Sequence, residues 1–362
     1  MTEFIPKYAG MTTGEITEKF RCDIDTALHQ RYGDDPDAVI IKRVEDEWDA
    51  LIHSGTLLDA ATLYELTLWL RENRSPYWMN GCAGSSFLFY LLGMTFGNPL
   101  PPHRYCPKCH RVDWESYIFR DGFDLPDLSC ESDGSPRIRD GHDIPYQMLW
   151  GYREFGEYQI KVVEPLVDPL LQILDLHWLR KSGAKPAQHE QLSTLIYYSN
   201  ITIECFLDPL EIRPSFHDVE VTADDVDFAL GEAGMLINEV FSEEHLEIPQ
   251  PMDFADLLSS LGLREVLDEK TRILWELGYT ASDLICFRDD VFRYLLDHGF
   301  SEEDAWKGMQ ECRKGRGLPI ITDEMQKSRD KWVIDRCESI LSLFPKAHAL
   351  EYILFKMRAS IL

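Results

Sequence analysis

The chain has 362 residues, of which 44% are hydrophobic and nine are Trp, enough apolar material to exclude a disordered chain. Its formal net charge of −27 argues against tight, nonspecific binding to DNA, because nucleic-acid binders carry an overall basic balance. A chain of this length is expected to form two domains.

The charge is unevenly distributed along the chain. Residues 214–263 contain twelve Asp or Glu and no Lys or Arg, whereas residues 301–362 carry eleven Lys or Arg against ten Asp or Glu. We therefore expect any surface that contacts nucleotide, primed DNA or single-stranded DNA to lie at the C-terminal end. The rest of the chain is acidic, which favours binding to protein partners.

No segment of the sequence predicts export or membrane insertion. The N-terminus, MTEFIPKYAG, lacks a basic start followed by an apolar core, and the most apolar run, residues 87–96, is about half of the ~20 residues that span a bilayer. Only three of the nine cysteines cluster, which fits a reducing compartment. We expect a cytoplasmic protein with no contact with membranes.

The first predicted elements are helices. Residues 34–55 place Val44, Trp48 and Leu51 on one helical stripe that ends at Gly55. The rest of this half predicts a second helix over 57–73, a Gly/Ser loop and an apolar helix over 79–97, and a strand over 112–119.

The second half changes character at a predicted linker. Before it, the pattern predicts helices from 151 to about 200, strands over 193–207 and 215–221, and a helix over 222–241 capped by Thr222. Residues 248–253, IPQPMD, are the linker candidate, and residues 253–362 read as helices throughout. In the segment 332–344, the helical period places Ile334, Cys337, Leu341 and Phe344 on one face.

Two short loops have the spacing of a zinc site. Twenty residues separate a C-x2-C pair from a C-x2-D pair, and the four candidate ligands are Cys106, Cys109, Cys130 and Asp133. Tetrahedral zinc accepts a carboxylate oxygen as well as thiolates, so a structural Zn²⁺ is expected here. His110 and His142 are substitute fourth ligands, and the alternative is a decayed loop with three free thiols.

Several strings resemble PolC-type bacterial DNA polymerase III. RVEDEWDALIHSG, GCAGSSF, NPLPPHRYCPKCH and GFDLPDLSC resemble its palm region in the same order, and FADLLSSLGL, GMQECRKGRGL and FPKAHA resemble its fingers. The resemblance covers roughly residues 28–152 and 253–358. It implies a truncated and diverged relative.

The fold implied by this resemblance is α+β and mostly helical. A reduced nucleotidyltransferase-type palm with a zinc-binding loop at 106–133 is expected over residues 28–252, after an N-terminal extension at 1–27. A helical, fingers-like domain is expected over 253–362. Enzymes of this family use two metal ions held by carboxylates, so Mg²⁺ is expected only if this chain is active.

The resemblance also suggests residues that contact nucleotide. In NGCAGSS, the residues Gly84, Ser85 and Ser86 correspond to a loop that holds the incoming triphosphate. Asn80 stands where the family has an arginine, and a neutral amide cannot supply the charge-assisted pairing of a guanidinium. The alternative for this loop is a helix-entry turn kept for packing.

Five residues of the fingers-like part correspond to positions at which proteins of the family contact the triphosphate and the template. They are Arg313, Lys314 and Arg316 in RKGRGL, with Lys346 and His348 in FPKAHA. A single Lys or Arg is usually a solvated surface group, so these five are candidates for contact with nucleotide or nucleic acid.

The family's catalytic carboxylates are the residues that this sequence lacks. The family carries an Asp-x-Asp pair on a palm strand soon after the zinc loops, but residues 143–159 hold no such pair, and we expect this strand to be absent. Of the acid-x-acid patterns elsewhere, only Asp218 and Glu220 lie on a predicted strand. In a chain with 63 acids, a solvated face is the plainer interpretation.

The leading hypothesis is therefore a PolC-like relative without catalytic activity, which acts as a binding or regulatory protein linked to DNA replication or defence. A small diverged nucleotidyltransferase that uses Asp218 and Glu220 is the alternative. A noncatalytic nucleic-acid binder that uses the C-terminal basic residues is the second alternative.

Overall fold

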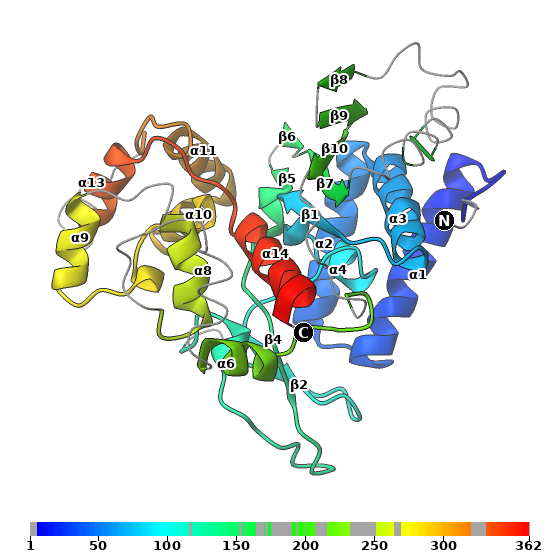
Figure 1. Ribbon diagram of the computed structural model, residues 1–362, viewed down its shortest axis with the longest axis horizontal. Coiled ribbons are helices and arrows are strands. Elements are labelled where there is room, and N and C mark those ends of the chain that lie inside the picture. Colours follow the sequence, from blue (N-terminus) through cyan, green and yellow to red (C-terminus); the bar gives the residue numbers. More distant parts are fainter. Residues whose placement is uncertain are drawn as a thin grey trace.

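The computed structural model shows helices at both ends of the chain and small sheets between them (Figure 1). It describes residues 6–115, 118–151, 154–155, 157–163, 170, 173–174, 190–192, 195–198, 200–206, 216–231, 251–263, 269–319 and 331–361. The fold class is α+β with a larger share of helix, as the sequence predicted. Among the described helices, none is long and apolar enough to cross a bilayer.

Three N-terminal helices begin and end at residues whose chemistry explains the boundaries. They are α1 (Thr13–Tyr32), α2 (Ala38–Ser54) and α3 (Leu57–Glu72). Thr12 and Glu15 form a capping box that starts α1, and Asp37 accepts a hydrogen bond from the backbone of Val39 at the start of α2. Gly55 ends α2 in the left-handed conformation, with φ of 71°.

A five-stranded sheet lies against these helices. Its strands, in spatial order, are β1 (Tyr77–Gly81), β7 (Tyr158–Val163), β10 (Ile201–Phe206), β9 (Leu195–Tyr198) and β8 (Glu190–Leu192). The second strand, β7, pairs antiparallel with β1 and parallel with the central strand β10. Tyr158, Ile160 and Val162 of β7 are completely buried, so one face of the sheet closes the first hydrophobic core.

A second, three-stranded sheet carries the cysteine loops. It consists of β2 (His103–Tyr105) between β3 (Val112–Trp114) and β4 (Ile138–Asp140), both antiparallel to it. A two-stranded ribbon, β5 (Trp150–Gly151) and β6 (Glu154–Phe155), leads from there to β7. The short apolar helix α4 (Phe87–Leu91) precedes all of these strands.

The C-terminal half is helical and has its own core. Its helices are α6 (Ala223–Gly231), α8 (Phe254–Leu263), α9 (Glu269–Glu276), α10 (Arg288–Asp297), α11 (Glu302–Cys312), α13 (Lys331–Ser339) and α14 (Lys346–Lys356). Thr222 caps α6 as predicted, because its hydroxyl accepts a hydrogen bond from the backbone of Asp225 at 3.3 Å. Phe287 and Phe292 are central, almost fully buried members of this second core.

Helix α14 joins the two halves. Figure 1 shows it between the sheet and the C-terminal helices, and it contacts both β1 and α8. Glu351 of α14 is fully buried and accepts backbone hydrogen bonds from Phe96 at 2.9 Å and from Gly97 at 2.9 Å. A Cβ atom at Gly97 would lie 2.2 Å from the side chain of Leu350, so only glycine lets α14 approach this closely.

Several sequence-based expectations about elements were wrong. Residues 158–163 form the strand β7 instead of a helix, and residues 216–221 form a turn and irregular backbone instead of a strand. Helix α13 ends at Ser339, which leaves Leu341 84% exposed instead of on a buried face. Most of the helix expected over 164–189, and residues 232–241 of the helix expected over 222–241, lie outside the described residues.

The expected domain boundaries do not coincide with the two cores. Residue 27 falls inside α1, and Ile16, Phe20 and Ile24 of that helix are buried in the first core. Phe123 and Ile144 precede the expected boundary at 253 yet belong to the second core. Residues of the range expected as an N-terminal extension therefore pack into the first core.

Candidate functional site

The two cysteine loops bring four ligand atoms together. One side-chain atom from each of Cys106, Cys109, Cys130 and Asp133 lies within 4.8 Å of the others. The Cys109 and Cys130 sulfurs are 3.5 Å apart, and the Cys106 sulfur lies 3.3 Å from an Asp133 oxygen. Tetrahedral zinc, with bonds of roughly 2.0–2.3 Å, needs ligand atoms at about this spacing. This donor set therefore fits a metal ion.

Each half of the cluster is a turn of the same design. The backbone N–H of His110 donates to the carbonyl of Cys106 at 2.9 Å, and that of Gly134 donates to the carbonyl of Cys130 at 2.8 Å. His110 and Gly134 both have positive φ, of 59° and 72°. Asp133 precedes Gly134 as the second cysteine precedes His110, so the carboxylate occupies the place of a cysteine in a repeated turn.

Hydrogen bonds favour the deprotonated form of two of these groups. Burial raises the pKa of the Cys106 thiol, but hydrogen bonds from the backbone N–H groups of Cys109 and Lys108 and with the Ser135 hydroxyl outweigh it and lower the pKa to about 7. The Ser135 hydroxyl and backbone N–H donate to Asp133 and lower its pKa to about 2. Metal ligands must be deprotonated, so the environment suits that role.

The two histidines considered as substitute ligands are engaged elsewhere. His110 Nδ1 lies 3.1 Å from the carbonyl oxygen of Arg31. His142 is completely buried, and its Nδ1 lies 2.9 Å from a carboxylate oxygen of Asp121. Within the described residues, Asp133 is therefore the fourth member of the cluster.

A second polar group lies on the face of the five-stranded sheet opposite the first core. Lys161 of β7 and Glu204 of β10 are paired in register, and their charged atoms form an ion pair at 3.0 Å. Asn80 of β1 donates to the other oxygen of Glu204 at 3.3 Å. The Lys161 ammonium also lies 5.3 Å from the centre of the Trp78 ring. We refer to this group as the Lys161–Glu204 pair.

The loop after β1 is turned inward. Ser85 and Ser86 are completely buried, and the Ser86 hydroxyl donates to Glu47 at 2.9 Å. The carboxylate of Glu47 also accepts the backbone N–H groups of Phe87 at 2.9 Å and Leu88 at 3.2 Å. A carboxylate of the chain itself therefore occupies the start of α4, where the sequence had suggested a triphosphate.

Gly84 has a packing role in the same loop. A Cβ atom there would lie 2.9 Å from the side chain of Glu351 and 3.3 Å from that of Ala347. The residue is buried beneath α14. Gly84, Ser85 and Ser86 thus form a helix-entry turn, and their role in binding nucleotide stays a prediction.

The five basic candidates divide into two groups on different helices. Arg313, Lys314 and Arg316 follow the end of α11, where Arg316 forms an ion pair with Glu311 at 3.0 Å and Lys314 is exposed. Lys346 and His348 begin α14.

The α14 pair lies close to the sheet. The Lys346 ammonium donates to the carbonyl of His142 at 2.6 Å, and His348 accepts a hydrogen bond from the backbone of Gly81 at 3.3 Å. Burial, followed by the charge of Lys161, lowers the pKa of His348 to about 4, so its imidazole is neutral at pH 7. His348 is thus a neutral acceptor beside the Lys161–Glu204 pair.

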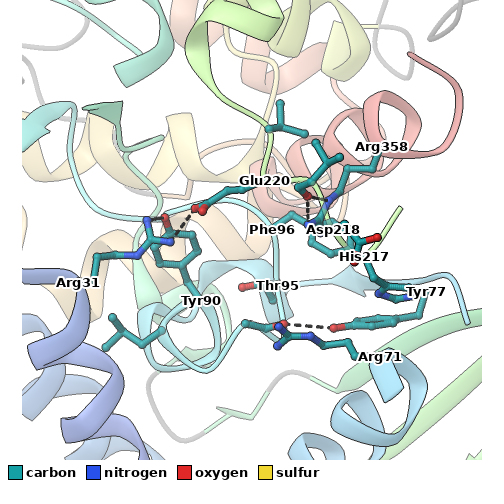
Figure 2. Close-up of a pocket in the computed structure, with 14 residues that line it drawn as sticks. Arg31, Arg71, Tyr77, Tyr90, Thr95, Phe96, His217, Asp218, Glu220 and Arg358 are labelled. Carbon is teal, nitrogen blue, oxygen red and sulfur yellow. Dashed lines mark hydrogen bonds and ion pairs between the residues drawn. The ribbon is translucent and has the colours of Figure 1, made fainter. Parts of the chain in front are cut away.

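Asp218 and Glu220 lie away from the sheet and face arginines. Glu220 forms an ion pair with Arg31 at 2.6 Å, and Asp218 forms one with Arg74 at 3.2 Å. Both acids line a cavity of about 290 Å³ that Figure 2 shows in close-up. Neither belongs to a group of three or more metal-ligating side chains in the part of the chain that the structure describes.

Sequence reasoning missed three charged residues. Lys161 and Glu204 alternate with the buried Ile160, Val162 and Ile203, a period of two that could have indicated an inner sheet face. No local sequence pattern indicated the role of Glu47, because its partners at the start of α4 lie about 40 residues further along the chain.

The chain is similar to three curated proteins described as DNA polymerase III PolC-type. It is 26% identical to that of Thermotoga petrophila, 25% to that of Staphylococcus aureus and 24% to that of Bacillus cereus, over 90–91% of this chain. The chain spans about a third of the length of these relatives, 31–32%.

The alignments also indicate segments that this chain lacks. The alignment with the Thermotoga petrophila protein runs over 451 positions, more than the 362 residues of this chain, so the relative carries segments without a counterpart here. No protein-family model matches the chain. From the shared identity over nine-tenths of its length, the chain is a diverged relative of PolC-type DNA polymerase III.

Proposed function

We propose that this chain is a PolC-like protein that does not add nucleotides and instead acts as a binding or regulatory protein linked to DNA replication or defence. In this proposal the five-stranded sheet, together with the three-stranded sheet that carries the cysteine loops, is a reduced palm, and residues 253–362 are a fingers-like domain. The link to replication rests on the similarity to DNA polymerase III of the PolC type.

The Lys161–Glu204 pair is the observation that carries the proposal. The resemblance places the catalytic Asp-x-Asp on a palm strand after the zinc loops, and β7 is the strand after those loops that pairs with β1. Its face outside the core presents Gln159 and Lys161, and the adjacent Glu204 is engaged by the Lys161 ammonium. One carboxylate neutralised by an ammonium group does not fit a pair of Mg²⁺ ions, and polymerase chemistry depends on such ions for charge stabilisation.

The alternative catalytic pair is not supported by its surroundings. The guanidinium groups of Arg31 and Arg74 neutralise Glu220 and Asp218, and the backbone of 216–221 is irregular. A cation would have to displace both arginines before these carboxylates could hold it. The hypothesis that this chain is a small nucleotidyltransferase therefore has less support than the hypothesis that it is an inactive relative.

Zinc is the metal that we propose for Cys106, Cys109, Cys130 and Asp133, in a structural role. Three thiolates and one carboxylate match its preference, and four protein ligands leave no open position for catalysis. The metal would hold the loops that extend from β2 and β4.

Protein partners fit the charge of the molecule better than DNA. A chain with a net charge of −27 repels nucleic acid at a distance, and a basic protein surface would be attracted to it. Lys314 is exposed, as a contact with the phosphates of DNA requires. A noncatalytic nucleic-acid binder is therefore a second candidate function with less support, and its retention on primed DNA would be salt-sensitive.

A primer-extension assay tests the proposal. Purified, zinc-loaded protein is incubated with primed template, all four deoxynucleotides and Mg²⁺ or Mn²⁺, with the Thermotoga petrophila relative as positive control. We expect no extension product. Extension by the wild type that is abolished by Glu204→Gln or Asp218→Ala would overturn the proposal, and a thermal shift with deoxynucleotides that Lys346→Ala abolishes would favour the nucleotidyltransferase.

A further inference from the structure

The cavity in Figure 2 is the one that Asp218 and Glu220 line, and it is separate from the cysteine cluster and from the Lys161–Glu204 pair. It is enclosed by the end of α1, the end of α3, the loop after α4, the segment 216–221 and the last turns of the chain, and its volume is about 290 Å³. The lining residues that matter here are Arg31, Arg71, Arg358, Thr95, Tyr77 and His217. None of them takes part in the cysteine cluster or the Lys161–Glu204 pair.

Two of the three arginines in this cavity have no carboxylate partner. Arg31 pairs with Glu220, but within the described part of the chain no Asp or Glu lies at ion-pair distance from Arg71 or Arg358. Arg358 donates to the carbonyl of Val219 at 2.7 Å and stacks over the Phe96 ring at 4.4 Å. Three arginines and two carboxylates, Asp218 and Glu220, line the cavity, so its charged side chains leave an excess of positive charge inside a strongly acidic chain.

The positive groups repel one another. Burial lowers the pKa of Arg358; Tyr77, Glu351 and Glu220 raise it in part, and the charge of Arg71 lowers it. Burial also lowers the pKa of His217 to about 4, and the charges of Arg358 and Arg71 add to the effect. A bound anion would relieve this repulsion and would meet the largely desolvated guanidinium of Arg358 beside the exposed guanidinium of Arg71.

A buried hydroxyl in the same cavity lacks a hydrogen-bond partner. Thr95 is 3% exposed, and its Oγ1 atom has no partner. Figure 2 shows this side chain among the labelled residues, between Tyr90 and Tyr77. Leaving a buried hydroxyl unpaired costs free energy, so the atom is suited to donate to an oxygen of a ligand.

The walls of the cavity suit a ligand that is larger than an inorganic ion. The aromatic rings of Tyr77, Tyr90 and Phe96 line it, and its volume lies at the lower end of the range for small-molecule sites. Gly93 leaves room for Arg71, because a Cβ atom there would lie 2.6 Å from the guanidinium. We propose that this cavity binds a small phosphorylated ligand of mononucleotide size, with its phosphate at Arg71, Arg358 and Thr95 and its ring against the aromatic wall.

Calorimetric titration of the full chain with deoxyadenosine monophosphate tests the inference. We expect saturable binding of the monophosphate, weaker binding of inorganic phosphate and no binding of deoxyadenosine. Arg71→Gln, which removes an exposed side chain without an ion pair, should weaken binding by about tenfold or more. Thr95→Val keeps the shape of the side chain and should weaken binding by about tenfold while thermal stability stays equal or rises.

Two control variants remove exposed ammonium groups that do not line the cavity. Lys19→Gln and Lys42→Gln should bind the monophosphate as the wild type does. The inference is wrong if no monophosphate binding is detected at millimolar concentration or if deoxyadenosine binds equally well. It is also wrong if binding survives Arg71→Gln and is lost in Lys346→Ala. None of these outcomes depends on whether the protein extends a primer.

Discussion

At the scale of single residues, Asp133 decides what the cysteine loops can hold. It stands in a turn of the same design as the C-x2-C turn, and its carboxylate reaches the other three ligand atoms. We expect Asp133→Cys to retain zinc, because thiolate is a stronger zinc ligand in such a turn. We expect Asp133→Ala to lower zinc affinity by more than about tenfold, since altering even a group behind a ligand has that effect.

Competition with a chromophoric chelator measures this affinity, and elemental analysis gives the stoichiometry. Glu131→Ala is a suitable control, because Glu131 is a largely exposed acid of the same loop that does not belong to the cluster. Equal zinc affinity of the wild type and Asp133→Ala would show that the carboxylate is not a ligand.

Glu47 is the second residue whose effect should be large. It is fully buried, caps the start of α4 and forms an ion pair with Arg43. Removal of the carboxylate in Glu47→Ala leaves a nearly buried guanidinium without its counter-charge, which costs about 3–5 kcal/mol of unfolding free energy. Urea unfolding followed by circular dichroism measures this loss.

The matched control lies on the same helix. Glu45 is about half exposed and pairs with Arg21, so Glu45→Ala should cost less than about 1 kcal/mol. Similar losses in both variants would contradict the capping role of Glu47.

At the scale of elements, the docking of α14 should make stability depend on pH. Burial raises the pKa of Glu351 to about 8, although the backbone N–H groups of Gly97 and Phe96 lower it in part. The unfolded chain releases this proton near its ordinary pKa of 4.5, whereas the folded protein retains it. The free energy of unfolding should therefore fall as the pH rises from about 4.5 to about 8, by an amount on the order of a few kcal/mol.

Urea midpoints measured at several values from pH 5 to pH 8 test this prediction. Glu351→Gln cannot titrate, so its midpoint should change less with pH than that of the wild type. The exposed Glu338 provides a control, and Glu338→Gln should keep the wild-type slope. Parallel slopes for Glu351→Gln and the wild type would mean that Glu351 does not carry the effect.

Some elements could be predicted from sequence patterns alone. Local signals placed α2, because Asp37 and Gly55 act on the residues beside them, and the capping box at Thr222 started α6. The spacing of the cysteine loops selected the four residues that come together. These features depend on contacts within a few residues, or on a ligand spacing that the sequence states directly.

The features that the sequence did not predict depend on distant partners. Strand β7 exists because β1, about 80 residues earlier, pairs with it, and its apolar positions were mistaken for part of a helix. The alternation in 215–221 resembled a strand, but Glu220 is held by Arg31 of α1 and Asp218 by Arg74 in the turn after α3, instead of by a neighbouring strand. Burial of Ser85 and Ser86 follows from Glu47 and α14.

At the scale of the whole molecule, the two cores and the charge give a consistent picture. The chain keeps a sheet, a helical second half and a helix that joins them, and it shares identity with PolC-type relatives over nine-tenths of its length. What differs is the chemistry on the sheet, where an ammonium group faces the one carboxylate of the Lys161–Glu204 pair. The central claim is that this sheet does not hold divalent ions.

Electron paramagnetic resonance of Mn²⁺ tests that claim most directly. The signal of free Mn²⁺ is recorded while zinc-loaded protein is titrated in, with and without a deoxynucleoside triphosphate, and Lys161→Asp is compared with the wild type. We predict that the wild type leaves the free signal unchanged relative to buffer or nucleotide alone. We also predict that Lys161→Asp, which sets two carboxylates side by side, reduces the signal. Loss of the free signal with the wild type, restored by Glu204→Gln, would contradict the account.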